Sequence, residues 1–211
     1  MRLASRMKCS GPKVLHSIAG RSLIGHVLAT AGELQPGHVI AVVRHARDSV
    51  VESITDAMPN ALIVDQDEIP GTGRAVEVAI AALPADFAGD VVVVSGDVPL
   101  LDAATLRSLI DTHRAASAAA TVLSAILDDA TGYGRIVRGS GGEVDRIVEQ
   151  ADATDDERAI TEINSGIYAF DLTPLFDALR GIGAANAQGE YYLPDLVSIY
   201  RRQGRAVTTW T

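Results

Sequence analysis

The sequence has little cysteine and few aromatic residues: of its 211 residues only Cys9 is a cysteine, and 4% are Phe, Trp or Tyr. One cysteine excludes an internal disulfide framework and is typical of a protein in a reducing compartment. No apolar run approaches the ~18 residues that cross a bilayer, and the N-terminus lacks the apolar block of a signal peptide. We therefore expect a cytoplasmic protein with no membrane partner.

Positive charge is also scarce, because 18 Lys and Arg face 27 Asp and Glu, for a net charge of -9. Binding to a nucleic-acid backbone needs a basic face, so we expect no nucleic-acid partner. The only lysines are Lys8 and Lys13, which form a positive N-terminal patch with Arg2 and Arg6. That patch is either a site for an anionic ligand or a chance result of a preference for arginine.

Several catalytic signatures are missing as well. The five histidines have no HExxH spacing, and neither a Gly-x-Ser-x-Gly elbow nor a complete GxGxxG fingerprint is present. These absences argue against a zinc hydrolase, a serine-triad hydrolase and a dinucleotide-binding enzyme.

The sequence does contain an alternation of strand-like and helix-like segments. Short apolar runs are typical of strands buried on both faces, and helical spacing separates them. This rhythm predicts an α/β, Rossmann-like fold with a mostly parallel sheet and helices on both faces. The strands are expected at 39–43, 61–64 and 90–97, and the helices at 21–34, 48–58, 73–83 and 102–116, the last capped by Asp102.

The pattern changes after about residue 120. Closely spaced strands with glycine-rich turns indicate an antiparallel flap, and Pro194 is well placed as the first residue of the last helix. We expect one domain over 1–211 with halves at 1–120 and 121–211. The expected elements are strands at 121–127, 133–137, 144–149 and 163–170, and helices at 173–179 and 194–203.

Asp97 is the first candidate for a chemical role, because it ends the strongest strand signal. In an open parallel sheet, ligands bind beyond the carboxyl ends of strands. A carboxylate there suits Mg²⁺, which is held by one or two carboxylates with phosphate oxygens. A turn or capping aspartate is the alternative, but Asp102 is already placed to cap the next helix.

Two loops provide further candidates. The segment from Gln66 to Gly73 joins a strand to a helix, and its small residues let backbone amides approach a ligand closely. It is not a P-loop, because the Gly-Lys-Ser/Thr ending is absent. Pro12 fixes the backbone ahead of Lys13, whose ammonium could meet phosphate. On spacing alone, a plain turn and a solvated lysine are the simpler interpretations.

These motifs and several others follow one another in a fixed order along nearly the whole chain. They are Arg6-Met7, 12–16, 19–22, Gln66, 71–75, 95–100, 132–136, 147–150, 163–168 and 186–193. In that order they resemble the N-terminal pyrophosphorylase domain of the bacterial N-acetylglucosamine-1-phosphate uridylyltransferases, which are bifunctional enzymes. Each motif is modest evidence alone, whereas the ordered set is specific.

The resemblance implies roles for individual residues. Lys13 matches the family's phosphate-binding lysine, Arg6 matches the arginine that closes its glycine-rich loop, and Asp97 matches its Mg²⁺ ligand. Tyr133 has no role that we assign. The other matches would bind substrates: Gln66, Gly71 and Thr72 the uracil, and Gly134, Glu149 and Asn164 the N-acetylglucosamine.

The implied reaction transfers UMP from UTP to N-acetylglucosamine 1-phosphate, giving pyrophosphate and the cell-wall precursor UDP-N-acetylglucosamine. The sugar phosphate is already ionised near pH 7 and needs no general base. Catalysis would therefore rest on positioning and electrostatics. Mg²⁺ on Asp97, with Lys13 and Arg6, would neutralise charge that grows on the phosphates.

The chain departs from the family at both ends. Residues 2–5 stand where the family has a two-glycine loop, with no strand before them. The family's second metal ligand and its trimer-forming β-helix acetyltransferase domain would follow Thr211, and Pro194 replaces a usual threonine. We expect a monomer that lacks acetyltransferase activity and binds nucleotide poorly.

Two alternatives stay open. One is a related nucleotidyltransferase that uses another sugar phosphate or another NTP. The other is a non-catalytic homologue that binds a nucleotide sugar or a partner. The altered glycine loop favours the second alternative, whereas retention of Lys13, Asp97, Glu149 and Asn164 opposes it.

Overall fold

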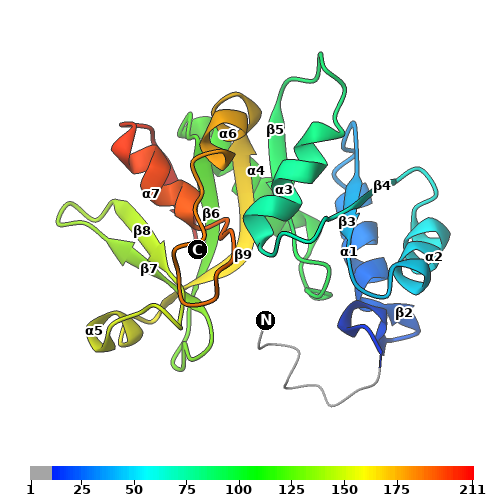
Figure 1. Cartoon of the computed structure of the whole chain (residues 1–211), viewed down its shortest axis with the longest axis horizontal. Coiled ribbons are helices and arrows are strands. Elements are labelled where there is room, and N and C mark those ends of the chain that lie inside the picture. The colour runs from blue at the N-terminus through cyan, green and yellow to red at the C-terminus, as the bar shows by residue number, and fades with distance from the viewer. Residues whose placement is uncertain (1–10) are drawn as a thin grey trace.

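The computed structural model describes residues 11–211, and Figure 1 shows the arrangement of their helices and strands. The described strands form two main sheets and a third, short one within residues 17–22. The elements are η2 (Lys13–Leu15), β1 (Ser17–Ile18), β2 (Arg21–Ser22), α1 (Leu23–Gly32), β3 (Ile40–Val43), α2 (Arg47–Ala57), β4 (Leu62–Asp65), α3 (Thr72–Ala81), β5 (Asp90–Val93), α4 (Ala103–Ala115), β6 (Ala120–Ile126), β7 (Gly134–Arg138), β8 (Val144–Val148), α5 (Asp155–Arg158), β9 (Glu162–Asp171), α6 (Leu172–Leu179), α7 (Asp195–Arg202) and β10 (Val207–Trp210).

The smaller of the two main sheets is the parallel pair β3–β4, in which Ile40 lies opposite Leu62. Helices α1 and α2 contribute Leu28 and Ile54 to an apolar cluster that also contains Val43 of β3. The short hairpin β1–β2 precedes α1. The apolar runs and helical spacings of this half of the chain therefore predict β3, β4, α1 and α2, although α1 begins at Leu23 and residues 21–22, predicted as helix, form β2.

The larger sheet has six strands in the order β10-β6-β9-β7-β8, with β5 also paired to β9. Among the described strands, parallel pairing is confined to β3–β4 and β10–β6, so the larger sheet is mixed and not mostly parallel as predicted. Antiparallel pairing extends beyond the expected flap, because β9 returns from the flap and lies between β5 and β6. The strands β7 and β8 form the flap itself, and β7 pairs with the start of β9.

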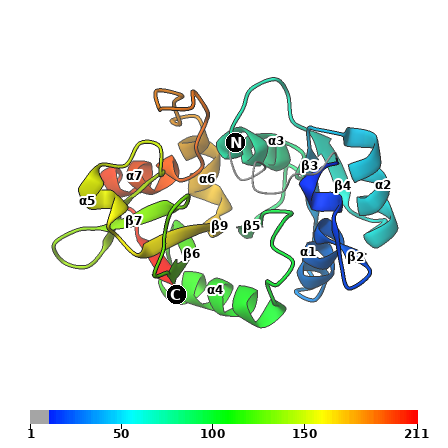
Figure 2. The same ribbon diagram turned by 90° about the horizontal axis from the view of Figure 1, so that it is seen from below.

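Within residues 11–211, no strand joins β3 to β5. Helices connect the two sheets instead: Thr30 Oγ1 of α1 donates to Leu101 O at 3.0 Å, and Arg107 Nη2 of α4 donates to Glu33 O at 2.8 Å. Figure 2 shows β3, β4, α1 and α2 on one side of the molecule and the larger sheet on the other. The residues on which we predict a missing first strand, 2–5, lie outside the described part.

Helices cover both faces of the larger sheet. Side chains of α3, α6 and α7, such as Val76, Leu175 and Tyr200, pack with Phe170 of β9 in the largest buried cluster. Leu109 of α4 packs in a second cluster with other residues of β9 and β6. This layered arrangement confirms the α/β fold class. Among the described residues, we find no helix with the length and apolarity to traverse a bilayer.

Local signals fix the ends of several helices. Asp102 caps α4 as predicted, because its Oδ1 accepts from Thr105 N at 2.7 Å. Pro194 is the N-cap residue of α7 and not its first helical residue, which corrects our assignment by one position. Helix α5 was not predicted, although Thr154 and Glu157 form a capping box at its start. The short strands β1, β2 and β10 were also not predicted.

Candidate active site

Lys13 and Asp97 meet although they are 84 residues apart in the chain, with Lys13 Nζ 2.5 Å from Asp97 Oδ2. Lys13 begins the short helix η2 directly after Pro12, and Asp97 follows β5. Both side chains are partly buried, with exposed fractions of 29% and 28%. The structure therefore brings together the predicted phosphate-binding lysine and the predicted metal ligand.

The strand register places a second group of candidates beside this pair. On one side of β9, Tyr168 is opposite Val93 of β5, while Asn164 is opposite Gly134 of β7. Between these pairings lies Gly166, whose φ is +81° and whose Cβ position would be 3.6 Å from Ser95 Oγ. The segment that carries Asp97 thus passes along β9 next to the residues predicted to hold the sugar.

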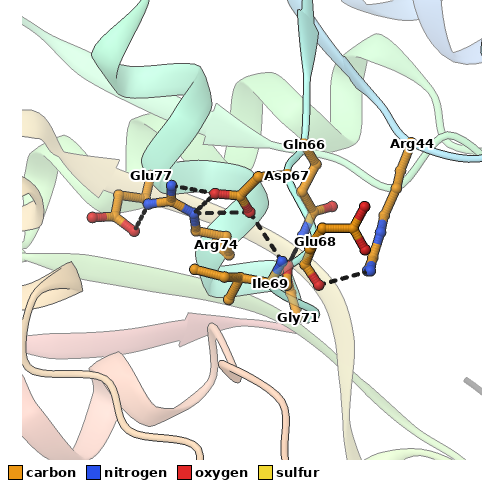
Figure 3. A network of polar contacts seen from close by, with 8 residues as sticks. All are labelled: Arg44, Gln66, Asp67, Glu68, Ile69, Gly71, Arg74 and Glu77. Atoms are coloured by element: carbon orange, nitrogen blue, oxygen red, sulfur yellow. Dashed lines mark hydrogen bonds and ion pairs between the residues drawn. The ribbon is translucent and has the colours of Figure 1, made fainter.

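The loop between β4 and α3 is held by its own side chains. Gln66 Nε2 donates to the carbonyl oxygens of Ile69 and Gly71, both at 3.0 Å, and Asp67 Oδ1 accepts from Ile69 N at 3.1 Å (Figure 3). Arg44 Nη2 donates to Glu68 O at 3.0 Å. Most polar groups of the loop therefore already have partners, and its backbone is fixed.

Arg74 fastens this loop to the first turn of α3. Its guanidinium lies between Asp67 and Glu77, with a shortest contact of 2.5 Å to Asp67 Oδ2 and one of 2.6 Å to Glu77 Oε2 (Figure 3). The hydrogen bonds from Arg74 hold the pKa of the Asp67 carboxyl below its ordinary value. Both carboxylates raise the pKa of Arg74, so Arg74 and Asp67 stay charged at neutral pH.

A distant segment, residues 186–193, is seated on the same loop, and we call it the strap. Tyr191 N donates to Pro70 O at 3.0 Å, and Tyr191 O accepts from Gly73 N at 2.8 Å. Thr72 Oγ1 accepts from Leu193 N at 3.1 Å. Gly71 is required here, because its φ is +122° and a Cβ would lie 2.3 Å from Tyr191 O.

Gly134, Glu149 and Asn164 lie together, and Glu149 shares a cavity with Asn186 and Tyr192 of the strap. Gly134 of β7 is opposite Asn164 of β9, and a Cβ at Gly134 would lie 2.9 Å from Glu149 Oε1. Asn164 is buried, and its Oδ1 accepts from Gly166 N at 3.0 Å. Three residues that are predicted to contact the sugar are therefore neighbours.

Glu149 also lines a cavity of about 210 Å³ with Asp152, Asn186, Tyr192 and Asp195. Burial raises the pKa of Glu149, and the charges of Asp152 and Asp195 raise it further. Burial and Asp152 likewise raise the pKa of Asp195. The pKa of the Tyr192 hydroxyl rises to about 12 through burial and the same carboxylates. This cavity therefore concentrates carboxylates whose charge is only partly compensated, by Arg135 at Glu149 and by Arg202 at Asp195.

The remaining predictions for the site concern Arg6 and the metal. Arg6 lies outside the described residues. Within residues 11–211, no group of three or more His, Cys, Asp or Glu side chains has metal-binding geometry. A single carboxylate such as Asp97 is enough to hold Mg²⁺, since that ion commonly takes one or two carboxylates and completes its shell with substrate phosphates and water.

Two features of the site were not assigned from the sequence. The strap lies within the predicted motif 186–193, but its contact with Gly71 joins distant segments. Arg135 lies within the motif 132–136 and is 2% exposed, although nothing in its sequence spacing distinguishes it from a surface arginine. The adjacent pair Pro70-Gly71 was the only local signal for a close approach.

Comparison with known proteins gives one matching family, the MobA-like NTP transferase domain, over residues 3–137. Among curated proteins, the bifunctional protein GlmU of Leifsonia xyli subsp. xyli is 59% identical over 200 residues, which are 95% of this chain and 41% of that protein. GlmU of Mycobacterium sp. (strain KMS) is 48% identical over 96% of this chain. The chain spans about two fifths of the length of these relatives. The resemblance inferred from the ordered motifs is confirmed.

Solved structures with this fold share little sequence. A UDP-glucose pyrophosphorylase in complex with UDP-glucose has a TM-score of 0.70 at 15% identity and covers 93% of this chain and 81% of its own. A nucleoside-diphosphate-sugar pyrophosphorylase from Vibrio cholerae RC9 also has a TM-score of 0.70, at 17% identity, over 99% of this chain and 86% of its own. These likenesses establish the fold.

Proposed function

The chain belongs to the family of MobA-like NTP transferase domains, and on that premise we propose that it transfers UMP from UTP to N-acetylglucosamine 1-phosphate. The products are pyrophosphate and UDP-N-acetylglucosamine, a precursor of the bacterial cell wall. One observation supports the proposal: Ser95, two residues before Asp97 of the Lys13–Asp97 pair, faces Gly166 of β9, which lies two residues from Asn164 of the Gly134–Glu149–Asn164 cluster. A nucleotide phosphate and a sugar phosphate would meet between them.

The reaction needs charge neutralisation more than covalent help. An oxygen of the sugar phosphate forms a bond to the α-phosphorus of UTP, and the bond from that phosphorus to the β-phosphate bridging oxygen breaks. Pyrophosphate leaves with the electron pair of the broken bond. The ammonium of Lys13 would stabilise the negative charge on the transferring phosphate, since fixed charges contribute most where charge develops. Mg²⁺, when held by Asp97, would neutralise the phosphates further.

The two binding regions divide the recognition of the substrates. The loop of residues 66–72 would present Gln66 and backbone groups of Gly71 and Thr72 to the uracil, from a backbone that is fixed before binding. Glu149 would accept hydrogen bonds from sugar hydroxyls, and Asn164 would bind the sugar or its acetamido group. Gly134 leaves the sugar room beside Glu149, because a side chain there would overlap that carboxylate.

Substitution of the phosphate-side pair tests the proposal. In a pyrophosphate-release assay with UTP and N-acetylglucosamine 1-phosphate, we expect Lys13→Ala and Asp97→Ala to lower kcat/KM by about 100-fold or more. Both variants should keep the far-ultraviolet circular dichroism spectrum of the unsubstituted protein. Lys8→Ala, at the one other lysine, and Asp111→Ala, at an exposed position of α4, serve as controls. Unchanged turnover in either site variant would refute the assignment.

Substrate specificity needs its own measurement, because another sugar phosphate or NTP would use the same phosphate chemistry. We expect the highest kcat/KM for UTP with N-acetylglucosamine 1-phosphate. Glucose 1-phosphate in place of the acetamido sugar, and CTP, ATP or dTTP in place of UTP, should each be used less well. A preference for one of these compounds would assign a different nucleotidyltransferase activity. Absence of turnover with binding of UDP-N-acetylglucosamine would assign a non-catalytic binding protein.

A further inference from the structure

Arg135, on β7, is buried to an extent that is rare for arginine, with 2% of its surface exposed. The ion pairs of residues 11–211 do not include Arg135, so its partners are neutral oxygens. Its Nε donates to Ile160 O at 3.0 Å, and its Nη1 makes a short hydrogen bond to Tyr133 O. Its Nη2 donates to Gln150 Oε1 at 2.8 Å.

These acceptors belong to three different segments around the sugar cluster. Tyr133 precedes β7, Gln150 follows Glu149 at the end of β8, and Ile160 follows α5. Gln150 Oε1 also accepts from Gly132 N at 3.1 Å. Arg135 and Gln150 therefore connect the turn before Gly134 with the backbone next to Glu149, through one shared oxygen atom.

This connection fixes a spacing that the sugar cluster needs. Gly134 is adjacent to Arg135, and Glu149 is adjacent to Gln150, so the hydrogen bond between Arg135 and Gln150 spans the same gap as the Gly134–Glu149 contact. Alternation along β7 sends the Arg135 side chain to the opposite face of the strand from Gly134. Arg135 can therefore hold both segments in place without entering the space that a ligand would occupy.

The charge of Arg135 acts on Glu149 as well. Burial, Asp152 and Asp195 all raise the pKa of Glu149, whereas Arg135 lowers it. A buried guanidinium without a carboxylate partner is costly, which is unexpected for a residue that only fills space. At this position the uncompensated positive charge favours the ionised form of a neighbouring carboxylate, which is the form that accepts hydrogen bonds from hydroxyl groups.

We propose that Arg135 is a positioning residue for the sugar half of the site, acting through Gln150 and the turn at 132–134 to hold Glu149 against Gly134. The proposal rests on the proposed function, because it identifies what sets the affinity for N-acetylglucosamine 1-phosphate. Arg135 touches neither substrate in this role. Its effect is on the affinity for the sugar phosphate, and the loop that would bind uracil is unaffected.

The test separates the two Michaelis constants. In Arg135→Lys, which keeps the charge and loses the guanidinium fork, we expect the KM for N-acetylglucosamine 1-phosphate to rise at least about tenfold. The KM for UTP should stay within about twofold. Gln150→Ala, which retains the arginine, should give the same split to a smaller degree. Arg138→Lys is the matched control, because Arg138 lies on the same strand and pairs with Glu162 at the surface.

A second measurement needs no turnover. Hydrogen exchange at the amide of Gly132, which donates to Gln150, should accelerate in Arg135→Lys and Gln150→Ala and not in Arg138→Lys. If the unsubstituted protein turns over no sugar phosphate, the proposed function fails while this measurement still tests the positioning role. Equal rises in both KM values, an unchanged sugar KM, or unchanged exchange at Gly132 in a folded Arg135→Lys variant would overturn the proposal.

Discussion

The loop between β4 and α3, with Arg74 and Glu77 of α3, and the carboxylate cluster around Glu149 both lie against the strap, and they differ in how their charges are compensated. In the loop, Arg74 faces Asp67 and Glu77, and the pKa of Asp67 is lowered. In the cluster, burial and neighbouring carboxylates raise the pKa of both Glu149 and Asp195. The first region is arranged so that its charged forms are stabilised, whereas the second holds carboxylates where their charged forms are disfavoured.

This difference indicates which region contributes to the stability of the fold and which serves ligand binding. A compensated loop contributes to the stability of the ligand-free protein and needs little rearrangement to bind a ligand. Carboxylates with raised pKa values gain nothing from folding and gather at sites of function. We therefore expect substitutions that disturb the loop backbone to cost stability, and loss of the Glu149 carboxylate to cost binding while it adds stability above about pH 4.

The largest effect is expected for Gly71→Ala, which tests whether the loop depends on the strap. A Cβ would lie within 2.3–2.7 Å of three backbone atoms of Tyr191, at a φ of +122°. We expect the free energy of unfolding to fall by about 3 kcal/mol from backbone strain and overpacking. The midpoint of thermal unfolding should fall by roughly 6–12 °C in a chain of this size.

Gly189→Ala is the matched control for this substitution. Gly189 lies in the strap and has a φ of +66°, but a Cβ there would have no atom within 4 Å. Its cost should be about 1 kcal/mol, the strain of the backbone conformation alone. Equal losses of stability in the two variants would show that backbone strain, and not contact with Tyr191, governs the loop.

A smaller effect of opposite sign is expected for Glu149→Gln. Because the pKa of Glu149 is raised on folding, the folded protein binds more protons than the unfolded chain between the two pKa values, so stability falls as pH rises through that window. The glutamine removes this penalty. We expect the variant to unfold at a higher temperature than the unsubstituted protein at pH 8, by a difference that disappears as the pH approaches about 4.

Glu157→Gln should show the reverse pH dependence. Hydrogen bonds from Thr154 and Arg146 lower the pKa of Glu157, so its contribution to stability is present at neutral pH and is lost as pH falls through the lowered pKa. Thermal unfolding of both variants between about pH 2.5 and pH 8 makes the comparison, because the loss for Glu157 falls below the ordinary pKa of a glutamate. A Glu149→Gln variant that is destabilised at pH 8 would mean that the carboxylate has a compensating partner in the ligand-free protein.

The smallest effect on stability is expected for Arg74→Ala, since exposed ion pairs add little to folding. Loss of the contacts to Asp67 and Glu77 should loosen the start of the loop and raise the KM for UTP by about two- to fivefold. The KM for the sugar phosphate should not change. A rise in the sugar KM equal to that for UTP would erase the distinction between the two regions.

Much of the fold follows from local sequence signals. Apolar runs predicted β3, β4 and β5, and Asp102 predicted the start of α4. Burial of a strand and capping of a helix both depend on residues that are neighbours in the sequence. The capping box of Thr154 and Glu157 shows that α5 was also predictable. The four-residue strand β10 was not, since it owes its pairing to β6, more than 80 residues earlier.

The ordered motifs supply the candidate residues of the site, whose roles stay predictions, but not the contacts between them. The structure brings these candidates together in two groups, Lys13 with Asp97 and Gly134 with Glu149 and Asn164. No sequence spacing reveals that Arg135 is buried or that Tyr191 rests on Gly71, because both depend on contacts between segments that are distant in the chain. Long-range geometry of this kind is decided by packing of the whole fold.

The contact between the strap and Gly71 also has a consequence for how the protein folds. The hydrogen bond from Leu193 to Thr72 closes a loop of 121 residues, and contacts between such distant segments form slowly because the entropy of closure precedes any gain. We expect the β3–β4 unit with α1 and α2 to form early during refolding and the strap to dock last. A chain still being synthesised would thus acquire both halves of its binding surface only after residue 193 has left the ribosome.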